Sequence, residues 1–172
     1  MKYFFWLYLY FITFLFSQSY LEVGMPAPEW AFPDAGGDMY TMEDWSGKIL
    51  QINYVDPDKS EMNEEFNDRV KKAIDVDSLI ARDSFKGIGI ADCASSWKPD
   101  FLIQAIGGKK AKKFETTVLF DYSAVLRKSW NLDEDSYNVI ILDKGRVVRG
   151  LYKGKMTESE MDTALQLIIS LQ

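Results

Sequence analysis

The stretch ILQINYV at residues 49–55 is followed directly by the turn DPDKSE at residues 56–61. The first segment is short, mostly apolar and bounded by charged residues, which is typical of a buried strand. Apolar residues then recur between positions 62 and 74 at three- and four-residue spacing, which predicts an amphipathic helix. We expect Asp58 or Ser60 to cap that helix. Residues 49–74 are therefore predicted to form a strand, a turn and a helix, the repeating unit of an α/β fold.

The rest of the chain continues the alternation of strands and helices. A short hairpin with a Gly-Gly turn precedes the first buried strand, and a hairpin around Asp-Lys-Gly follows near the C-terminus. Further strands are expected at residues 87–91, 117–120, 138–142 and 146–151, and helices at 99–106, 123–130 and from 157 onward. This order predicts an α/β fold, a three-layer sandwich with a central mixed β-sheet and an N-terminal β-hairpin.

Several helix ends are marked by particular residues. Thr157 and Glu160 form a capping box at the start of the last helix, and Asp121 is expected to cap the helix before it. Gly107 and Gly108 are expected to end the helix that begins at Pro99. The lysine-rich run 109–113 would then lie in a solvated connecting loop, with contact to anionic lipid as the alternative.

The first nineteen residues have the pattern of a secretory signal. Lys2 precedes an uncharged, strongly apolar run from Tyr3 to Phe16, and Ser17-Gln18-Ser19 supplies a small-x-small cleavage site. The run is shorter than the ~20 residues that a membrane-spanning helix needs. We expect residues 1–19 to be a cleaved signal peptide and residues 20–172 to form one domain, without stable membrane insertion after cleavage. An uncleaved N-terminal anchor is the alternative.

The composition excludes several classes of activity. The chain has no histidine, one cysteine and a net charge of −6. Without histidine, a Ser-His-Asp triad, a histidine-paired cysteine nucleophile and a histidine-bearing zinc site are impossible. A single cysteine cannot form an intramolecular disulfide, and an acidic chain is a poor partner for nucleic acid. We expect no cofactor and no metal.

Several segments resemble a known family. Residues 24–28 (GMPAP) and 41–48 (TMEDWSGK) are similar to the opening of the redoxin and peroxiredoxin group. More narrowly, Gly47-Lys48, residues 130–136 (WNLDEDS) and residues 142–147 (LDKGRV) resemble the YtfJ family of bacterial periplasmic proteins. The resemblance implies a thioredoxin-like fold and a periplasmic location, and it implies no particular activity.

The chain departs from active thioredoxin relatives at two positions. Those relatives carry a redox cysteine pair in the turn after the first buried strand, where this chain has residues 56–61 and no cysteine. They also place a cis-proline before the strand that here begins at Asn138, and Tyr137 takes that position. Thiol–disulfide exchange needs an attacking thiolate and usually a resolving thiol. The resemblance therefore implies a redox scaffold without redox chemistry.

Two further groups of residues are candidates for chemistry. Asp56 and Asp58 are placed as the nucleophile and acid of a phosphatase would be, but no later motif supports that interpretation, and helix capping is favoured. The same turn is a poor match to a calcium loop. Cys93 is either an exposed reactive thiol or, as we favour, a small buried hydrophobe. Trp97 and Trp130 are expected to pack in the core, with a binding face as the alternative.

The sequence thus favours a non-catalytic binding or adaptor module of the periplasm. We expect Tyr137 to lie beside Asp56 and Asp58 at the strand ends, where open α/β sheets bind ligands. These three residues would hold a cationic or hydrogen-bond-donating group of an unidentified protein or peptide partner. Alternatively, Tyr137 fills the space left by the absent disulfide and proline. The alternative function is that of a redoxin-type thiol oxidoreductase or antioxidant protein acting through Cys93.

Overall fold

A computed structural model describes residues 20–172, so the predicted signal peptide lies outside the described residues. The central sheet has five strands in the order β5-β4-β3-β6-β7. Their bounds are β3 (Ile49–Val55), β4 (Phe85–Asp92), β5 (Thr117–Asp121), β6 (Tyr137–Leu142) and β7 (Val148–Lys153). β3, β4 and β5 are parallel, whereas β6 is antiparallel to both β3 and β7. The sheet is therefore mixed, as predicted.

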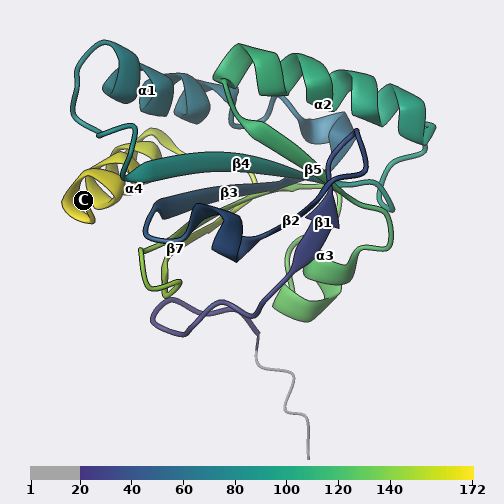
Figure 1. The fold of residues 1–172 in the computed structure, drawn as a ribbon, viewed down its shortest axis with the longest axis horizontal. Helices are drawn as coiled ribbons and strands as arrows, with labels where there is room; N and C mark the ends of the chain where they lie inside the picture. Colours follow the sequence, from purple (N-terminus) through teal and green to yellow (C-terminus); the bar gives the residue numbers. More distant parts are fainter. Residues whose placement is uncertain (1–19) are drawn as a thin grey trace, which may run out of the picture.

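Helices and a small hairpin cover the two faces of this sheet (Figure 1). One face carries α1 (Glu64–Asp75), α2 (Asp100–Phe114) and α4 (Glu158–Ser170). The other carries α3 (Val125–Trp130) and the separate two-stranded sheet of β1 (Ala31–Pro33) and β2 (Met39–Thr41). This is the three-layer sandwich with an N-terminal hairpin that the sequence predicts.

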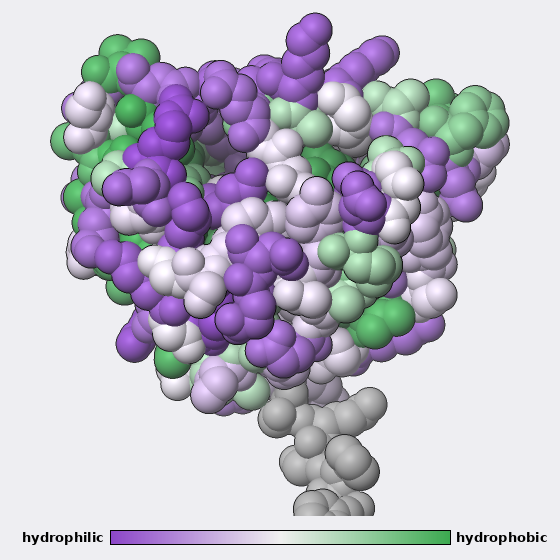
Figure 2. Space-filling model, in the orientation of Figure 1, coloured by the Kyte–Doolittle hydropathy of each residue, from purple (hydrophilic) through white to green (hydrophobic). Residues whose placement is uncertain are grey.

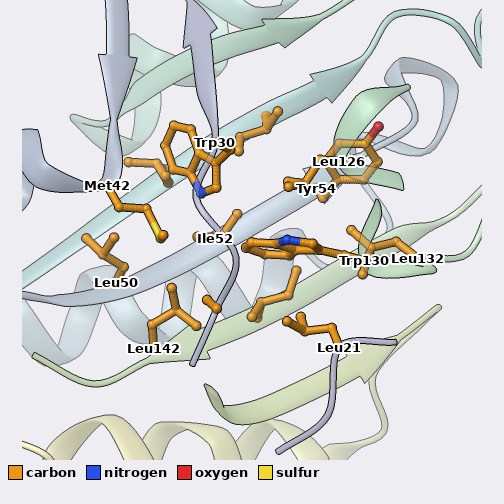
Figure 3. Close-up of a cluster of buried hydrophobic side chains, with 14 of the residues drawn as sticks. Leu21, Trp30, Met42, Leu50, Ile52, Tyr54, Leu126, Trp130, Leu132 and Leu142 are labelled. Carbon is orange, nitrogen blue, oxygen red and sulfur yellow. The ribbon is translucent and has the colours of Figure 1, made fainter. Parts of the chain in front are cut away.

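The core on the hairpin side is tightly filled by large side chains (Figure 3). Trp30 from the segment before β1 and Trp130 from α3 pack against Leu50 and Ile52 of β3, and all four are buried. Trp30 also stacks on Phe32 at a ring-centroid distance of 5.7 Å. Burial of such side chains contributes roughly 1.5–3 kcal/mol each, so this face anchors the hairpin to the sheet.

Helix α2 is longer than the sequence predicts. The helix continues through Gly107 and Gly108 to Phe114, so the expected stop at the two glycines was wrong. Gly107 faces the sheet, where a Cβ atom would lie 3.0 Å from Val118 Cγ1 and 3.1 Å from Phe120 Cζ. Here glycine permits a close approach of helix to strand rather than ending the helix. The lysine-rich run consequently lies on the helix and not in a connecting loop.

The start of α1 also differs from the prediction. Asp56 caps the short 3₁₀ helix η2 (Pro57–Lys59), because its Oδ1 accepts a hydrogen bond of 2.7 Å from the Asp58 N–H. Helix α1 begins later, after Asn63, so neither Asp58 nor Ser60 caps it. The Asn63 side chain instead donates to the Gly154 carbonyl and accepts from the Met156 N–H, at 2.9 Å each. This contact ties the start of α1 to the segment before α4.

The remaining predicted caps are confirmed. Thr157 and Glu160 form a reciprocal capping box on α4. Asp121 accepts hydrogen bonds of 2.9 Å from the N–H groups of both Val125 and Leu126, at the start of α3. These bonds satisfy backbone donors that a helix leaves free at its N-terminus.

An arginine that the sequence placed in a strand lies in a turn instead. Arg146 precedes β7 and has a left-handed φ of 64°. Its guanidinium is buried and donates to the carbonyls of Trp45 and Lys48, at 2.6 and 2.7 Å, and of Met42 at 2.9 Å. The 3₁₀ helix η1 (Met42–Trp45) is thereby fixed to the C-terminal hairpin.

Within residues 20–172, no helix has both the length and the apolar character that crossing a membrane requires.

Candidate functional site

Each of the three parallel strands leads into a buried aspartate at its carboxyl end. Asp56 follows β3, Asp92 ends β4, and Asp121 ends β5 directly opposite Asp92 in the sheet register. Ligands of open α/β sheets bind outside the carboxyl ends of the strands. We call these three aspartates the strand-end row. From the sequence, Asp56 was predicted as a site residue and Asp121 only as a helix cap, whereas no role was predicted for Asp92.

Asp121 is held by donors from two sides. Besides the N–H groups of α3, its Oδ2 accepts a hydrogen bond of 3.1 Å from the buried Tyr54 hydroxyl. Burial, together with the charges of Asp121 and Asp92, raises the pKa of Tyr54 far above its usual range. Tyr54 is therefore a neutral donor at any physiological pH.

Asp92 is paired with Arg127, a partner that the sequence does not predict. Its Oδ2 lies 2.7 Å from Arg127 Nε in a contact that is close but not aligned as a hydrogen bond. Arg127 also pairs with Glu134, at 2.5 Å between Nη1 and Oε1. Burial raises the pKa of Asp92, and the Arg127 charge opposes that rise. Asp92 and Arg127 are far apart in the chain, so their pairing leaves no local pattern in the sequence. The one sequence feature that points to the strand-end row is that the apolar strands repeatedly end in aspartate.

Asp56 and Asp58 have separate structural roles. Burial raises the pKa of Asp56, with a hydrogen bond from Ser95 opposing and the nearby Asp135 adding to the rise. Asp58 lies nearer the surface. Its Oδ2 accepts a 3.0 Å hydrogen bond from Ser96 Oγ, and its Oδ1 pairs with Lys98. Asp58 thus tethers the loop after β4 to the turn after β3.

The backbone of Tyr137 lies where the sequence analysis expected it. Tyr137 pairs with Val55 in the sheet, and the Asp56 N–H donates to the neighbouring Ser136 carbonyl at 2.9 Å. Its side chain, however, is only 3% exposed and lies among the residues under α1 and α4. The hydroxyl accepts a 2.8 Å hydrogen bond from Asn67 Nδ2. This is the arrangement that the space-filling alternative describes, and a role of Tyr137 in binding stays a prediction.

Cys93 is buried directly after β4. Its side chain is 7% exposed and packs with Ile103 and Phe120. Burial, reinforced by the carboxylates of Asp100, Asp121 and Asp92, raises the pKa of the thiol to about 12. Because the thiolate is the reactive form, this cysteine is a protonated, poorly reactive group near neutral pH.

The surface beside the strand-end row carries large exposed side chains. Trp97 is 82% exposed in the loop after β4, so its expected core position was wrong, and Phe101 is 72% exposed on the first turn of α2. Tyr122, after β5, is also exposed, and its hydroxyl accepts a 3.0 Å hydrogen bond from Gln104 on the next turn of α2. We call Trp97, Phe101 and Tyr122 the aromatic surface. Figure 2 shows hydrophobic atoms over the right-hand end of α2, with further hydrophobic atoms along the left side of the same face.

Residues 20–172 contain no group of three or more His, Cys, Asp or Glu side chains placed to hold a metal ion. The strand-end row consists instead of aspartates that cap helices or pair with Arg127. The strand-end row is therefore a buried network of hydrogen bonds and ion pairs that stabilises the structure next to the exposed aromatic surface.

Comparison with known proteins places this architecture in a family. Residues 38–171 match the family described as "Bacterial protein of unknown function (YtfJ_HI0045)". The chain belongs to this family. The match spans the strand-end row, Tyr137 and Cys93, and it confirms the resemblance seen in the sequence. Among curated proteins, none matches the chain.

Solved structures with the same fold are thioredoxin-like proteins. This member of the YtfJ family is similar to peroxidoxin BcpB from Mycobacterium tuberculosis, with a TM-score of 0.64 and 12% identity over 89% of this chain and 99% of that one. It is also similar to the thioredoxin domain of a thiol-disulfide oxidoreductase from Bacteroides vulgatus, with a TM-score of 0.60 and 12% identity over 87% and 99% of the two chains. At this identity the likeness shows the fold alone.

A third similar structure is an exposed lipoprotein thioredoxin of Streptococcus pneumoniae. Its TM-score is 0.57, with 16% identity over 81% of this chain and 98% of that one. The YtfJ-family chain therefore shares its thioredoxin-like fold with thiol-disulfide oxidoreductases, while its own single cysteine is buried.

Proposed function

We propose that this YtfJ-family protein is an exported, non-catalytic binding module of the periplasm. The observation that carries the proposal is the environment of Cys93, which is buried among apolar side chains and has a pKa raised to about 12. A second support is the turn at residues 56–61, which holds a capping aspartate where thioredoxin relatives carry their cysteine pair. The same observations speak against the alternative of a Cys93-dependent oxidoreductase.

The partner would contact the aromatic surface and the loop beside it. Exposed aromatic side chains bury large areas at little entropic cost, and they dominate the binding energy of many interfaces. Trp97 is the most exposed large hydrophobic residue among residues 20–172, and Phe101 and Val76 follow at 72% each. Asp58 lies next to the same loop and is an acceptor that can exchange its Lys98 partner for a basic group of another protein. The fitting partner is a protein or peptide with apolar anchors and basic side chains.

Site-specific photo-crosslinking tests this surface. A benzophenone amino acid is placed at position 97 or, as a matched exposed control, at position 39 on the hairpin, where Met39 is also exposed. We expect a discrete protein adduct from position 97 in the periplasm, retained in Cys93→Ser and lost in Phe101→Ala. Adducts that are the same from both positions, or that depend on Cys93, would overturn the proposal.

Export is tested separately by sequencing the N-terminus of the protein isolated from a bacterial periplasmic fraction. We expect a mature chain beginning at Tyr20, as the Ser17-Gln18-Ser19 site predicts. A chain that begins at Met1 and remains in the cytosol would contradict the location.

A further inference from the structure

A cavity of about 400 Å³ lies between α1 and α2, above β3 and β4. Figure 1 shows the two helices side by side over this part of the sheet. Its floor includes Gly87 and Gly89, which alternate along β4 on the helix-facing side. A Cβ atom at Gly87 would meet no atom closer than 3.8 Å. The cavity therefore exists because glycines stand where larger side chains could otherwise fill the space.

The walls of the cavity are mostly apolar. Val70 and Ile74 line it from α1, and Ile103 and Ile106 line it from α2. Small-molecule sites in proteins are typically concave, mainly apolar and about 300–1,000 Å³ in volume, with a few placed polar groups. This cavity has that size and that type of wall.

A neutral polar cluster lies in the floor beside the glycines. Gln51 Nε2 donates to Asn53 Oδ1 at 3.1 Å and to Asn67 Oδ1 at 2.9 Å, and Asn67 Nδ2 donates to the Tyr137 hydroxyl at 2.8 Å. All four side chains line the cavity. Their hydrogen bonds fix the orientation of the Gln51 amide.

One acceptor of this cluster has no partner within residues 20–172. Gln51 is 2% exposed, and its Oε1 is buried without a hydrogen bond to any group in that range. An unsatisfied buried polar atom costs about 1–3 kcal/mol, so such atoms in folded proteins call for an explanation. Since Nε2 is engaged by both asparagines, Oε1 is the acceptor of the Gln51 amide that stays free, and a rotation of the side chain would present it to a group in the cavity.

Some charged residues on the rim are paired with one another. Lys71 contacts Asp75 and Glu115 at 2.7 and 2.9 Å, and Arg82 pairs with the same two carboxylates. These pairs bridge the ends of α1 and α2. Lys48 and Lys86, at the other end where β3 and β4 begin, have no carboxylate partner within the described part of the chain. Lys86 lies over the Trp45 ring at 5.8 Å. The groups on the floor next to the glycines, Gln51, Asn53 and Asn67, are uncharged amides.

We propose that this cavity binds a small, uncharged amphipathic molecule whose apolar body lies between α1 and α2 and whose polar group donates a hydrogen bond to Gln51 Oε1. The apolar walls fit the body, and the glycines of β4 leave room for it. This site is separate from the aromatic surface, and the inference does not depend on the proposed function.

The probe for the test is N-phenyl-1-naphthylamine, an uncharged aromatic amine with one N–H whose fluorescence rises in apolar surroundings. Its comparison compound is 1-benzylnaphthalene, in which a methylene group replaces the N–H. We expect saturable one-to-one binding of the amine to the whole mature chain. The amine should bind about fivefold more tightly than the hydrocarbon in a competition titration, as one hydrogen bond provides.

Filling the cavity should abolish binding of the probe. Gly87→Leu extends a side chain from β4 into the space, and we expect at least a tenfold loss of affinity for the amine. Gly108→Leu is the matched control, because a Cβ atom at Gly108 on the exposed side of α2 meets nothing within 4 Å. The control should bind within twofold of the wild type. Equal binding by both variants, or no saturable binding by the wild type, would overturn the proposal.

A measurement on the wild type alone does not depend on how the variants fold. In a ¹⁵N-correlated NMR titration with the amine, the amide signals of Gly87 and Gly89 should shift. The signal of Gly154, outside the cavity lining, should not. Shifts confined to other parts of the chain would place the probe elsewhere and contradict the assignment.

Discussion

The two faces of β3 and β4 are built from alternate residues of the same strands, yet they differ in packing. Toward the hairpin and α3, Leu50, Ile52 and Tyr54 of β3 enter a dense core with two buried tryptophans. Toward α1 and α2, Gln51 and Asn53 form a polar cluster beside a cavity. Successive side chains of a strand point to opposite faces of the sheet, so one segment encodes both surfaces.

β4 repeats the same division. Its sequence FKGIGIAD places Ile88 and Ile90 in the hairpin-side core and Gly87 and Gly89 on the helix side. The apolar positions hold the fold together, and the glycine positions leave space. The two strands are therefore densely packed on the face with α3, whereas on the other face they leave a cavity between α1 and α2.

The largest expected effect comes from breaking the dense face. Trp130→Ala removes a side chain that is 1% exposed, and we expect a loss of about 3–5 kcal/mol in the free energy of unfolding, because a large cavity remains. Trp97→Ala, at the exposed aromatic surface, should change it by less than about 0.5 kcal/mol. Urea denaturation of both variants measures the difference. Equal losses of unfolding free energy in the two variants would contradict the assignment of Trp130 to the core and Trp97 to the surface.

A second pair of variants separates the contact of α2 with the sheet from its solvent side. Gly107→Ala places a methyl group against Val118 and Phe120 and should destabilise the protein by about 1 kcal/mol, because overpacking outweighs the gain in helix propensity. Gly108→Ala meets no neighbour and should stabilise by about 0.5–1 kcal/mol. Thermal unfolding monitored by circular dichroism measures whether each variant is less or more stable than the wild type. A stabilising Gly107→Ala would contradict the close approach.

Tyr137→Phe tests the polar cluster on the helix face. The change leaves Asn67 Nδ2 without its acceptor, and we expect a cost of about 1 kcal/mol in the free energy of unfolding. Photo-crosslinking from position 97 should be unaffected if Tyr137 only fills space. Loss of the adduct without loss of stability would instead favour Tyr137 as a recognition residue.

Asp56→Asn tests the strand-end row through its pH dependence. Burial raises the pKa of Asp56 above its usual value of 3.8, so the folded state binds its proton more tightly than the unfolded chain does. Its contribution to stability is present below about pH 4 and is lost as pH rises through the raised pKa. Asparagine keeps an acceptor oxygen for the cap. We therefore expect the variant to match the wild type near pH 3.5 and to be more stable than the wild type at pH 7.

Urea titrations of both proteins across this pH range measure that difference. A wild type that gains stability over Asp56→Asn as pH rises would show that ionised Asp56 is favoured in the fold, contrary to its buried setting.

The sequence predicted the order of elements because each strand and helix has its own periodicity. Local caps, such as Thr157 with Glu160, were predicted for the same reason. The length of α2 was not, because the role of Gly107 depends on Val118 and Phe120 in a different element. The pairing of Asp92 with Arg127 likewise joins residues far apart in the chain. Burial of Cys93 was predicted because free cysteines are usually buried. Its carboxylate neighbours could not be predicted, because the fold brings them together.

The most direct test of a thioredoxin-like scaffold without thiol chemistry is the consumption of hydrogen peroxide and the reduction of insulin by the wild type and Cys93→Ser. With the thiol buried and its pKa raised to about 12, we expect both proteins to be indistinguishable from a buffer control near pH 7. Turnover by the wild type that disappears in Cys93→Ser would contradict the binding-module proposal and establish thiol chemistry at Cys93.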